Sequence, residues 1–226
     1  MSRILIVITS CDRIGDTEQK TGFWLEELAS PYYVFVDAGA DVTLASIKGG
    51  EPPLDPTSEL PESQTEATER FMADDDAKKR LKQTLAIADA QVDDYDAIFL
   101  PGGHGTMWDF PNSAILTQLI EGFDRAQKAI SAVCHAPAAL VSVKSASGEP
   151  LVKGRTITAF TDSEERAVQL DKIVPFLLET RLRELGGNFT AAADFELNVE
   201  QDGHLITGQN PASSQLVAQR VLEFCS

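Results

Sequence analysis

The amino-acid sequence predicts an α/β protein in which helices cover a mostly parallel β-sheet. Short apolar runs rich in β-branched residues alternate along the chain with longer amphipathic segments. The 226 residues are 43% hydrophobic and 24% charged, as in an ordinary globular protein, and they suffice to bury one large core. We therefore expect a single domain over residues 1–226.

Six segments have the length and the apolar, β-branched character of buried strands. They are Arg3 to Thr9, Asp41 to Ser46, Ala97 to Leu100, Ala129 to Val133, Thr156 to Ala159, and Leu205 to Thr207. The tripeptide Asp202-Gly203-His204, just before the last of these strands, is typical of a hairpin turn.

Amphipathic segments between the strands predict five helices. They are Phe23 to Gly39, Ser113 to Ala126, His135 to Val143, Val174 to Leu185, and Ala212 to Phe224. We expect the first helix to be bent or broken at Pro31. Gly186-Gly187 is a good C-terminal stop for the fourth helix, and Asn210-Pro211 is a good start for the fifth.

The segment from residue 51 to residue 91 differs from the rest of the chain. It opens with prolines and continues with acid-rich helical patterns at Glu66 to Met72 and Asp76 to Ile87. This composition predicts a helical excursion from the sheet. A lid, a dimer surface and an insertion without a role all fit the pattern.

The charge and the termini limit the choice of partner and location. A formal net charge of -16 repels phosphate backbones and anionic lipids, so we expect neither a nucleic acid nor a membrane as partner. The apolar run at Ile4 to Ile8 is too short for a secretory signal, and no stretch approaches the roughly 20 apolar residues of a membrane span. We therefore expect a cytoplasmic protein.

Cys134 stands where a predicted strand runs directly into a predicted helix. Ala132 and Ala136, two residues on either side, are small enough for strand and helix to cross closely in a strained turn, as in the pattern G-x-S-x-G. Free N–H groups and the dipole of a helix N-terminus favour an anion there, so we expect a pKa below the usual value of about 8.5 and a reactive thiolate. The alternative is a small buried hydrophobic residue.

Two further segments favour the reactive interpretation. Gly103 and His104 lie in a glycine-rich turn that follows a strand, where backbone N–H groups can approach an oxyanion closely. Glu27 is the better inward candidate of the pair Glu26-Glu27 on the first helix. A carboxyl group held against an apolar wall has a raised pKa and can shuttle protons.

Four separated segments resemble the ThiJ/PfpI superfamily in the same order, over almost the whole chain. They are Lys20 to Glu27 with Pro31, Leu100 to Gly105, Ala132 to Pro137, and Gly208 to Ser213. Within the superfamily they are most similar to the branch of heat-shock chaperones and glutathione-independent glyoxalases. The resemblance implies a flavodoxin-like three-layer sandwich, usually a homodimer.

The resemblance also implies roles for individual residues. Cys134 matches the nucleophile, His135 its partner and Glu27 the acidic member of the site, while Gly103 and His104 match the oxyanion turn. The implied activity converts a 2-oxoaldehyde such as methylglyoxal to the 2-hydroxy acid. It needs neither glutathione nor any metal or organic cofactor, because the hydrogen moves as a proton.

Other functions stay open at this point. Deglycation of carbonyl adducts on proteins or nucleotides uses the same residues, and a stress chaperone or a redox sensor based on Cys134 needs no turnover. Glutamine amidotransfer requires a downstream histidine, for which His204 is a poor candidate. Peptidase activity ranks behind the carbonyl chemistry.

The remaining candidate groups receive no catalytic role. Glu164-Glu165 and Glu179 are interpreted as a solvated helix face. A metal site of His104, His135, Cys134 and Glu27 is disfavoured because we expect adjacent Cys and His side chains to diverge. Three widely spaced cysteines predict neither disulfides nor a zinc knuckle; Cys11 is a packing residue or an oxidisable thiol.

Overall fold

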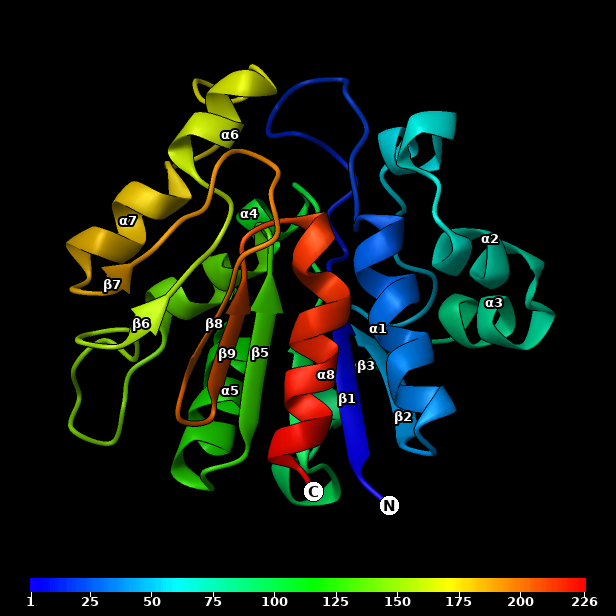
Figure 1. Ribbon diagram of the computed structural model, residues 1–226, viewed down its shortest axis with the longest axis horizontal. Helices are drawn as coiled ribbons and strands as arrows, with labels where there is room; N and C mark the ends of the chain where they lie inside the picture. Colours follow the sequence, from blue (N-terminus) through cyan, green and yellow to red (C-terminus); the bar gives the residue numbers. More distant parts are fainter.

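The computed structural model describes residues 1–226 and is built around a seven-stranded sheet (Figure 1). The strand order is β3-β2-β1-β4-β5-β9-β8, and only the pair β8–β9 is antiparallel. These strands are β1 (Arg3–Ile8), β2 (Asp41–Ser46), β3 (Leu85–Ala86), β4 (Ala97–Leu100), β5 (Ala129–Val133), β8 (Val199–Asp202) and β9 (Leu205–Gly208). The predicted α/β class with a mostly parallel sheet is confirmed.

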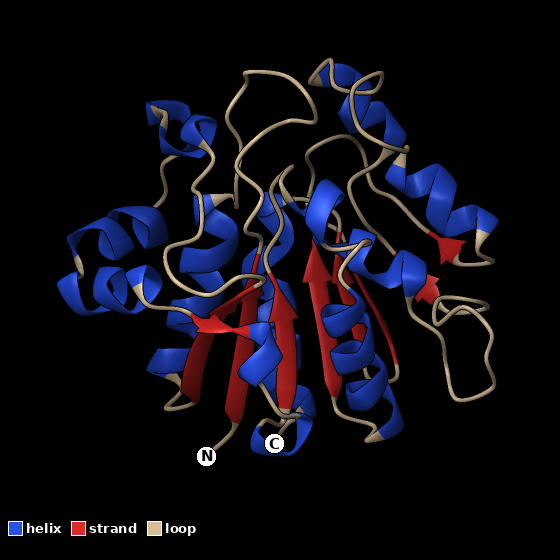
Figure 2. Ribbon diagram, turned by 180° about the vertical axis from the view of Figure 1, so that it is seen from behind, coloured by secondary structure: helices blue, strands red, loops and turns tan.

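Helices cover both faces of the sheet, as Figures 1 and 2 show from opposite sides. The α-helices are α1 (Leu25–Asp37), α2 (Glu66–Ala73), α3 (Asp75–Lys82), α4 (Thr106–Asp109), α5 (Ala114–Arg125), α6 (Asp162–Ala167), α7 (Leu178–Glu184) and α8 (Ser214–Phe224). Helices α1 and α8 pack side by side on one face, and α5 packs on the other. None of the helices combines the length and the apolar character that a membrane span requires.

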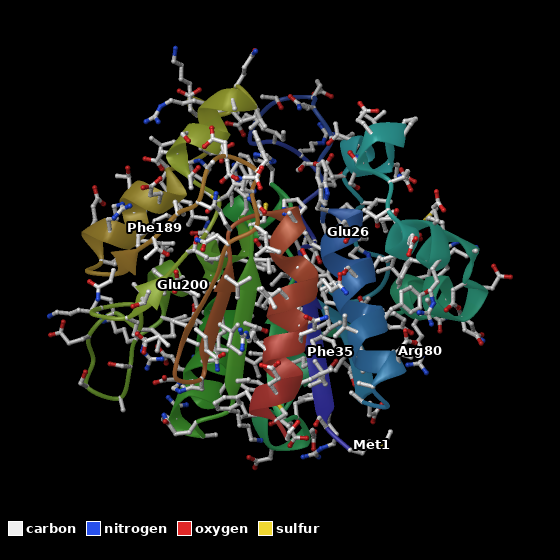
Figure 3. All side chains as sticks on the ribbon, viewed as in Figure 1. Met1, Glu26, Phe35, Arg80, Phe189 and Glu200 are labelled. Atoms are coloured by element: carbon white, nitrogen blue, oxygen red, sulfur yellow. The ribbon has the colours of Figure 1, made fainter.

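The central strand β1 shows why the sheet is buried on both faces. Ile4, Ile6 and Ile8 belong to the core beneath α1 and α8, whereas Leu5 and Val7 belong to the core beneath α5. Because side chains alternate along a strand, a continuous apolar run supplies both cores. Phe35 of α1, labelled in Figure 3, packs edge-on against Phe99 of β4 in the first core.

Most predicted helices form, with shifted ends. Helix α1 begins at Leu25 because Phe23 is still extended and donates its N–H to Pro53. The helix continues through Pro31 without a break. The segment from residue 136 to residue 142 is a 3-10 helix rather than an α-helix.

The predicted strand Thr156 to Ala159 is wrong as a member of the main sheet. Only β6 (Thr156–Ile157) is extended, and it pairs with β7 (Asn188–Phe189) in a separate two-stranded sheet. The edge of the main sheet is formed instead by the β8–β9 hairpin, whose turn contains His204 as predicted. The sequence Val-Glu-Gln-Asp of β8 lacks the apolar run that a buried strand has, because the strand lies at an edge.

The 51–91 segment leaves the sheet and returns to it. After 3-10 turns at Pro56–Glu59 and Pro61–Ser63, helix α2 packs against the outside of α1. Phe71 of α2 is buried there, edge-on to Tyr32 at 5.7 Å between ring centroids. The helix predicted up to Ile87 ends at Lys82, and the chain then enters the sheet as β3. Short 3-10 turns at Ile87–Asp89 and Val92–Asp94 lead on to β4.

Strand order also locates the site. The chain leaves β1 toward β2 on one side of the sheet and reappears as β4 on the other side of β1. Ligands of open α/β sheets bind beyond the carboxyl ends of the strands at such a switch point. The loops that follow β1, β4 and β5 meet there, at the upper end of the sheet in Figure 1.

Candidate active site

Cys134 lies in a sharp turn directly after β5. Its φ of 58° is in the left-handed region, which costs a non-glycine residue about 1–2 kcal/mol. Two backbone hydrogen bonds fix the turn: the Cys134 N–H donates to the carbonyl of Gly208 at 2.9 Å, and the Phe160 N–H donates to the Cys134 carbonyl at 2.8 Å. The strained strand-to-helix turn predicted from the flanking alanines is confirmed.

Three groups surround the sulfur of Cys134, which is only 4% exposed. The Nδ1 atom of His135 lies 3.2 Å from Sγ. The Glu27 carboxyl group and the Gly103 N–H are both within hydrogen-bonding reach of the sulfur. The expectation that adjacent Cys and His side chains diverge is wrong, because the left-handed backbone of Cys134 turns both side chains toward the same space.

Glu27 reaches this space from the first turn of α1. Its Oε2 atom accepts a hydrogen bond from the Gly102 N–H at 2.7 Å, and the side chain is fully buried. Oε1 makes no standard hydrogen bond, which leaves it available to the sulfur. The neighbouring Glu26, labelled on α1 in Figure 3, instead accepts from Thr65, so Glu27 is the inward residue as expected.

Burial raises the pKa of Glu27 from 4.5 to about 8, as predicted for a carboxyl group against an apolar wall. At neutral pH this group is therefore mostly protonated. Because the folded state holds the proton more tightly than the unfolded chain, Glu27 favours folding below pH 4.5. This contribution is lost as the pH rises toward and through 8.

Replacing Glu27 with glutamine is therefore expected to flatten the pH dependence of stability. The stability of the variant relative to the wild type should rise between pH 5 and pH 8.5, by at most about 5 kcal/mol at the roughly 1.4 kcal/mol that one pKa unit carries. Urea unfolding at several pH values measures the difference. Parallel curves for the two proteins would show that Glu27 does not take up the proton on folding.

The predicted lowering of the Cys134 pKa is wrong for the free protein. Burial, and then the nearby Glu27 carboxyl group, raise the pKa of the Cys134 thiol well above its ordinary value. Burial, and then the adjacent His104, lower the pKa of His135. At neutral pH the resting site thus holds an uncharged thiol, an uncharged imidazole and a protonated Glu27.

Glu165 is a member of the site that the sequence interpretation missed. It lies on α6, is 2% exposed, and its two oxygens contact two imidazoles. Oε2 lies 2.7 Å from Nε2 of His135, and Oε1 lies 2.8 Å from Nε2 of His104. The predicted solvated face is therefore wrong here, because the loop before α6 folds the first turn of this helix onto the carboxyl end of β5.

The charge of Glu165 sets the tautomer of His135. Burial opposes its ionisation, but the adjacent His135 and the hydrogen bonds from both histidines outweigh it and lower its pKa. A carboxylate only accepts hydrogen bonds, so both Nε2 atoms carry the hydrogen. In the neutral imidazole of His135 the lone pair is then on Nδ1, which faces the sulfur. His135, oriented by Glu165, can therefore take the proton of the Cys134 thiol.

Glu164, also interpreted as solvated, is fully buried beside Glu165. Its two oxygens accept five hydrogen bonds, from the Thr161 N–H and hydroxyl, the Phe195 N–H, and the side-chain amides of Gln209 and Asn210. Thr161 and Glu164 form a capping box at the start of α6. This Thr-x-x-Glu pattern is the local signal that could have located the helix start, although not the burial of its acids.

The glycine-rich turn after β4 approaches the sulfur as expected, through Gly103. This residue has a φ of 102°, and a Cβ atom there would lie 2.4 Å from the carbonyl oxygen of Gly22, so only glycine fits. His104 contributes its imidazole, through Glu165. Its ring lies 4.0 Å from that of His135 between centroids. Glu179 is partly exposed on α7 and bonds Arg183.

Two histidines and a glutamate in the site could together hold a metal ion. His104, His135 and Glu165 have donor atoms within 4.8 Å of one another, close enough for one metal ion. An ion bound there would take Glu165 away from His135.

Cys11, after β1, is half-buried and donates from Sγ to the Arg13 carbonyl at 3.3 Å. Burial raises the pKa of its thiol.

Comparisons with known proteins identify the family of the chain. The model of the DJ-1/PfpI family matches residues 20–224. The glutathione-independent glyoxalase HSP31 of Saccharomyces cerevisiae is 28% identical over 98% of this chain and 97% of its own length.

Two solved structures superimpose closely on the chain. The 24 kDa rapid encystment protein of Francisella tularensis has 38% identity and a TM-score of 0.95, covering 100% of both chains. Glyoxalase III of Candida albicans has 27% identity and a TM-score of 0.91, covering 99% of this chain and 97% of its own. With a family match over nearly its full length and the elbow cysteine in place, the chain belongs to the DJ-1/PfpI family.

Proposed function

We propose that the protein is a glutathione-independent glyoxalase that converts a 2-oxoaldehyde such as methylglyoxal to the 2-hydroxy acid. The names of two relatives, from Saccharomyces cerevisiae and Candida albicans, support this activity. The observation that carries the proposal is the position of the Cys134 sulfur between an acid that is protonated at neutral pH, Glu27, and a base oriented by a carboxylate, His135 with Glu165.

The first step is addition of the sulfur to the aldehyde carbon. His135 takes the thiol proton at Nδ1, and the imidazolium is stabilised by Glu165. The new S–C bond forms while the carbonyl oxygen receives the proton of Glu27, and the Gly103 N–H stabilises the developing negative charge. The product is a hemithioacetal, with Glu27 now ionised and His135 now protonated.

The second step moves hydrogen between the two carbons. Ionised Glu27 removes the proton from the former aldehyde carbon, while protonated His135 gives its proton to the ketone oxygen, which produces an enediol. Glu27 then returns a proton to the former ketone carbon. The hydroxyl group on the sulfur-bearing carbon loses its proton to His135, which leaves a thioester. Water hydrolyses the thioester, which frees Cys134 and releases the hydroxy acid.

Glutamine amidotransfer fits the molecule less well. It requires a downstream histidine near the nucleophile, and His204 precedes β9, at the amino end of the strand. Because β9 is parallel to β5, His204 lies at the amino ends of these strands, whereas Cys134 lies at their carboxyl ends. The Nε2 atom of His204 bonds Asp124 at 2.8 Å. Deglycation uses the same residues as the glyoxalase reaction.

We also propose a homodimer, as the family resemblance implies. The 51–91 segment divides into two parts. Residues near Asp55 pack against the segment that precedes α1, since the Asp55 N–H donates to the Phe23 carbonyl and Thr21 bonds the Asp55 side chain. Helices α2 and α3 lie outside α1, toward the side of the molecule (Figure 1), where they are a better candidate for a dimer surface than for a lid.

Incubation of the purified protein with methylglyoxal in the absence of glutathione tests the proposal. We expect stoichiometric conversion to lactate, followed by NMR spectroscopy, and we expect Cys225→Ser to retain it, because Cys225 lies on α8's C-terminal end and contacts the Asp96 carbonyl. A wild-type protein that produces no lactate while a glycated peptide loses its adduct would replace the glyoxalase proposal with deglycation. Inactivity on both would favour a chaperone or a redox sensor.

A further inference from the structure

An aromatic pair extends from the site toward solvent. The ring of Phe160 lies 4.2 Å from the ring of His135 between centroids and is itself buried. The ring of Phe195 lies 6.2 Å from that of Phe160 between centroids, and the residue is 49% exposed. The proposed chemistry uses neither side chain.

The backbone of Phe195 is held in an unfavourable conformation. Its φ of 64° is in the left-handed region, where a bulky aromatic residue is an outlier that costs of order 1–3 kcal/mol. The Phe195 N–H donates to Oε1 of Glu164 at 2.7 Å. Glycine or asparagine would adopt this conformation with less strain, and burial does not explain a large aromatic ring that is half exposed.

Glu164 fastens the loop that carries Phe195. Besides Phe195, this buried carboxyl group accepts hydrogen bonds from Gln209 and Asn210, and the Asn210 amide also donates to the Glu196 carbonyl at 2.8 Å. Ser163 of α6 bonds Asp194 in the same loop. The loop is thereby tied to α6, the helix that supplies Glu165, so Phe195 has a fixed position relative to His135.

We propose that Phe160 and Phe195 form an apolar subsite for the substituent on the ketone carbon of the substrate. This inference rests on the proposed glyoxalase function and deepens it. With the aldehyde carbon on the Cys134 sulfur, beside the His135 ring that Phe160 contacts, a phenyl substituent offers ring surface to the aromatic pair, and a methyl group offers almost none. The preferred substrates are then 2-oxoaldehydes with an aromatic or branched apolar substituent, of which phenylglyoxal is the simplest aromatic probe.

The ratio of kcat/KM for phenylglyoxal to kcat/KM for methylglyoxal tests the subsite. In Phe195→Ala we expect this ratio to fall by about tenfold, as loss of one aromatic contact predicts. The value for methylglyoxal should fall less than the value for phenylglyoxal, since a methyl group offers no ring surface for an aromatic contact. Phe195→Tyr should keep the wild-type ratio, because tyrosine retains the ring.

Leu197→Ala is the matched control, because Leu197 lies in the same loop, is 52% exposed and has no aromatic ring. Its ratio should equal that of the wild type. An unchanged ratio in a Phe195→Ala protein that still turns over methylglyoxal would overturn the subsite alone. This holds whether both values of kcat/KM stay at the wild-type level or fall by the same factor. Failure of the wild type to convert either aldehyde would instead remove the glyoxalase function, and the subsite with it.

Discussion

Replacing Cys134 with alanine is expected to lower kcat for methylglyoxal by at least about 10³-fold, because no other group in the site can form the covalent hemithioacetal. The remaining cysteines cannot substitute for it. Cys11 bonds the Arg13 carbonyl after β1, and Cys225 lies at the end of α8. The measurement is lactate formation at saturating methylglyoxal.

The thermal midpoint of the alanine variant separates lost chemistry from lost folding. Alanine keeps a Cβ atom, so the strain of the left-handed turn is unchanged. The 4% exposed side chain loses only its sulfur atom. We expect a folded protein with a midpoint within a few degrees of the wild type. Turnover near the wild-type rate in a folded Cys134→Ala protein is incompatible with a nucleophilic role.

The second large effect is expected for Glu165→Gln, with a loss in kcat of about 10²–10⁴-fold. The carboxylate accepts hydrogen bonds from Nε2 of both His104 and His135, whereas an amide offers one acceptor and one donor. One of the two imidazoles must then move its hydrogen to Nδ1. If His135 does so, it can no longer take the thiol proton, and in either case the negative charge beside the imidazolium is lost.

Glu184→Gln is the control for this substitution, since Glu184 ends the neighbouring helix α7 and forms an exposed ion pair with Arg181. Its kcat should match the wild type. A reduction in kcat with little change in KM is the expected signature for Glu165→Gln, because the substitution alters proton transfer rather than binding. Wild-type kcat in Glu165→Gln would mean that Glu165 supports the fold only.

Much of the fold could be predicted because its signals are local. Buried parallel strands such as β1 are continuous apolar runs, and Ser113 marks the start of α5 by accepting a hydrogen bond from the Leu116 N–H. The errors occur where partners decide the structure. Thr156–Ile157 has the sequence of a strand but pairs with β7, and the polar strand β8 joins the main sheet through its hairpin with β9.

The site divides in the same way. The turn at Cys134 and the inward position of Glu27 follow from residues next to them in sequence. Glu165 was missed because its role depends on a tertiary contact across 30 residues with His135. The pKa of Cys134 was predicted in the wrong direction, because the short 3-10 helix after it offers a weak dipole, whereas full burial beside Glu27 penalises the thiolate strongly.

Acid quenching of the protein during turnover, followed by mass spectrometry of the peptide that contains Cys134, tests the central claim most directly. During turnover of methylglyoxal we expect this peptide to gain the mass of one methylglyoxal molecule, and to lose it as the substrate is exhausted. The peptides of Cys11 and Cys225 should stay unmodified. Lactate formation with no adduct on Cys134 at any time of quenching, or with an adduct that outlasts the substrate, would contradict covalent catalysis by this sulfur.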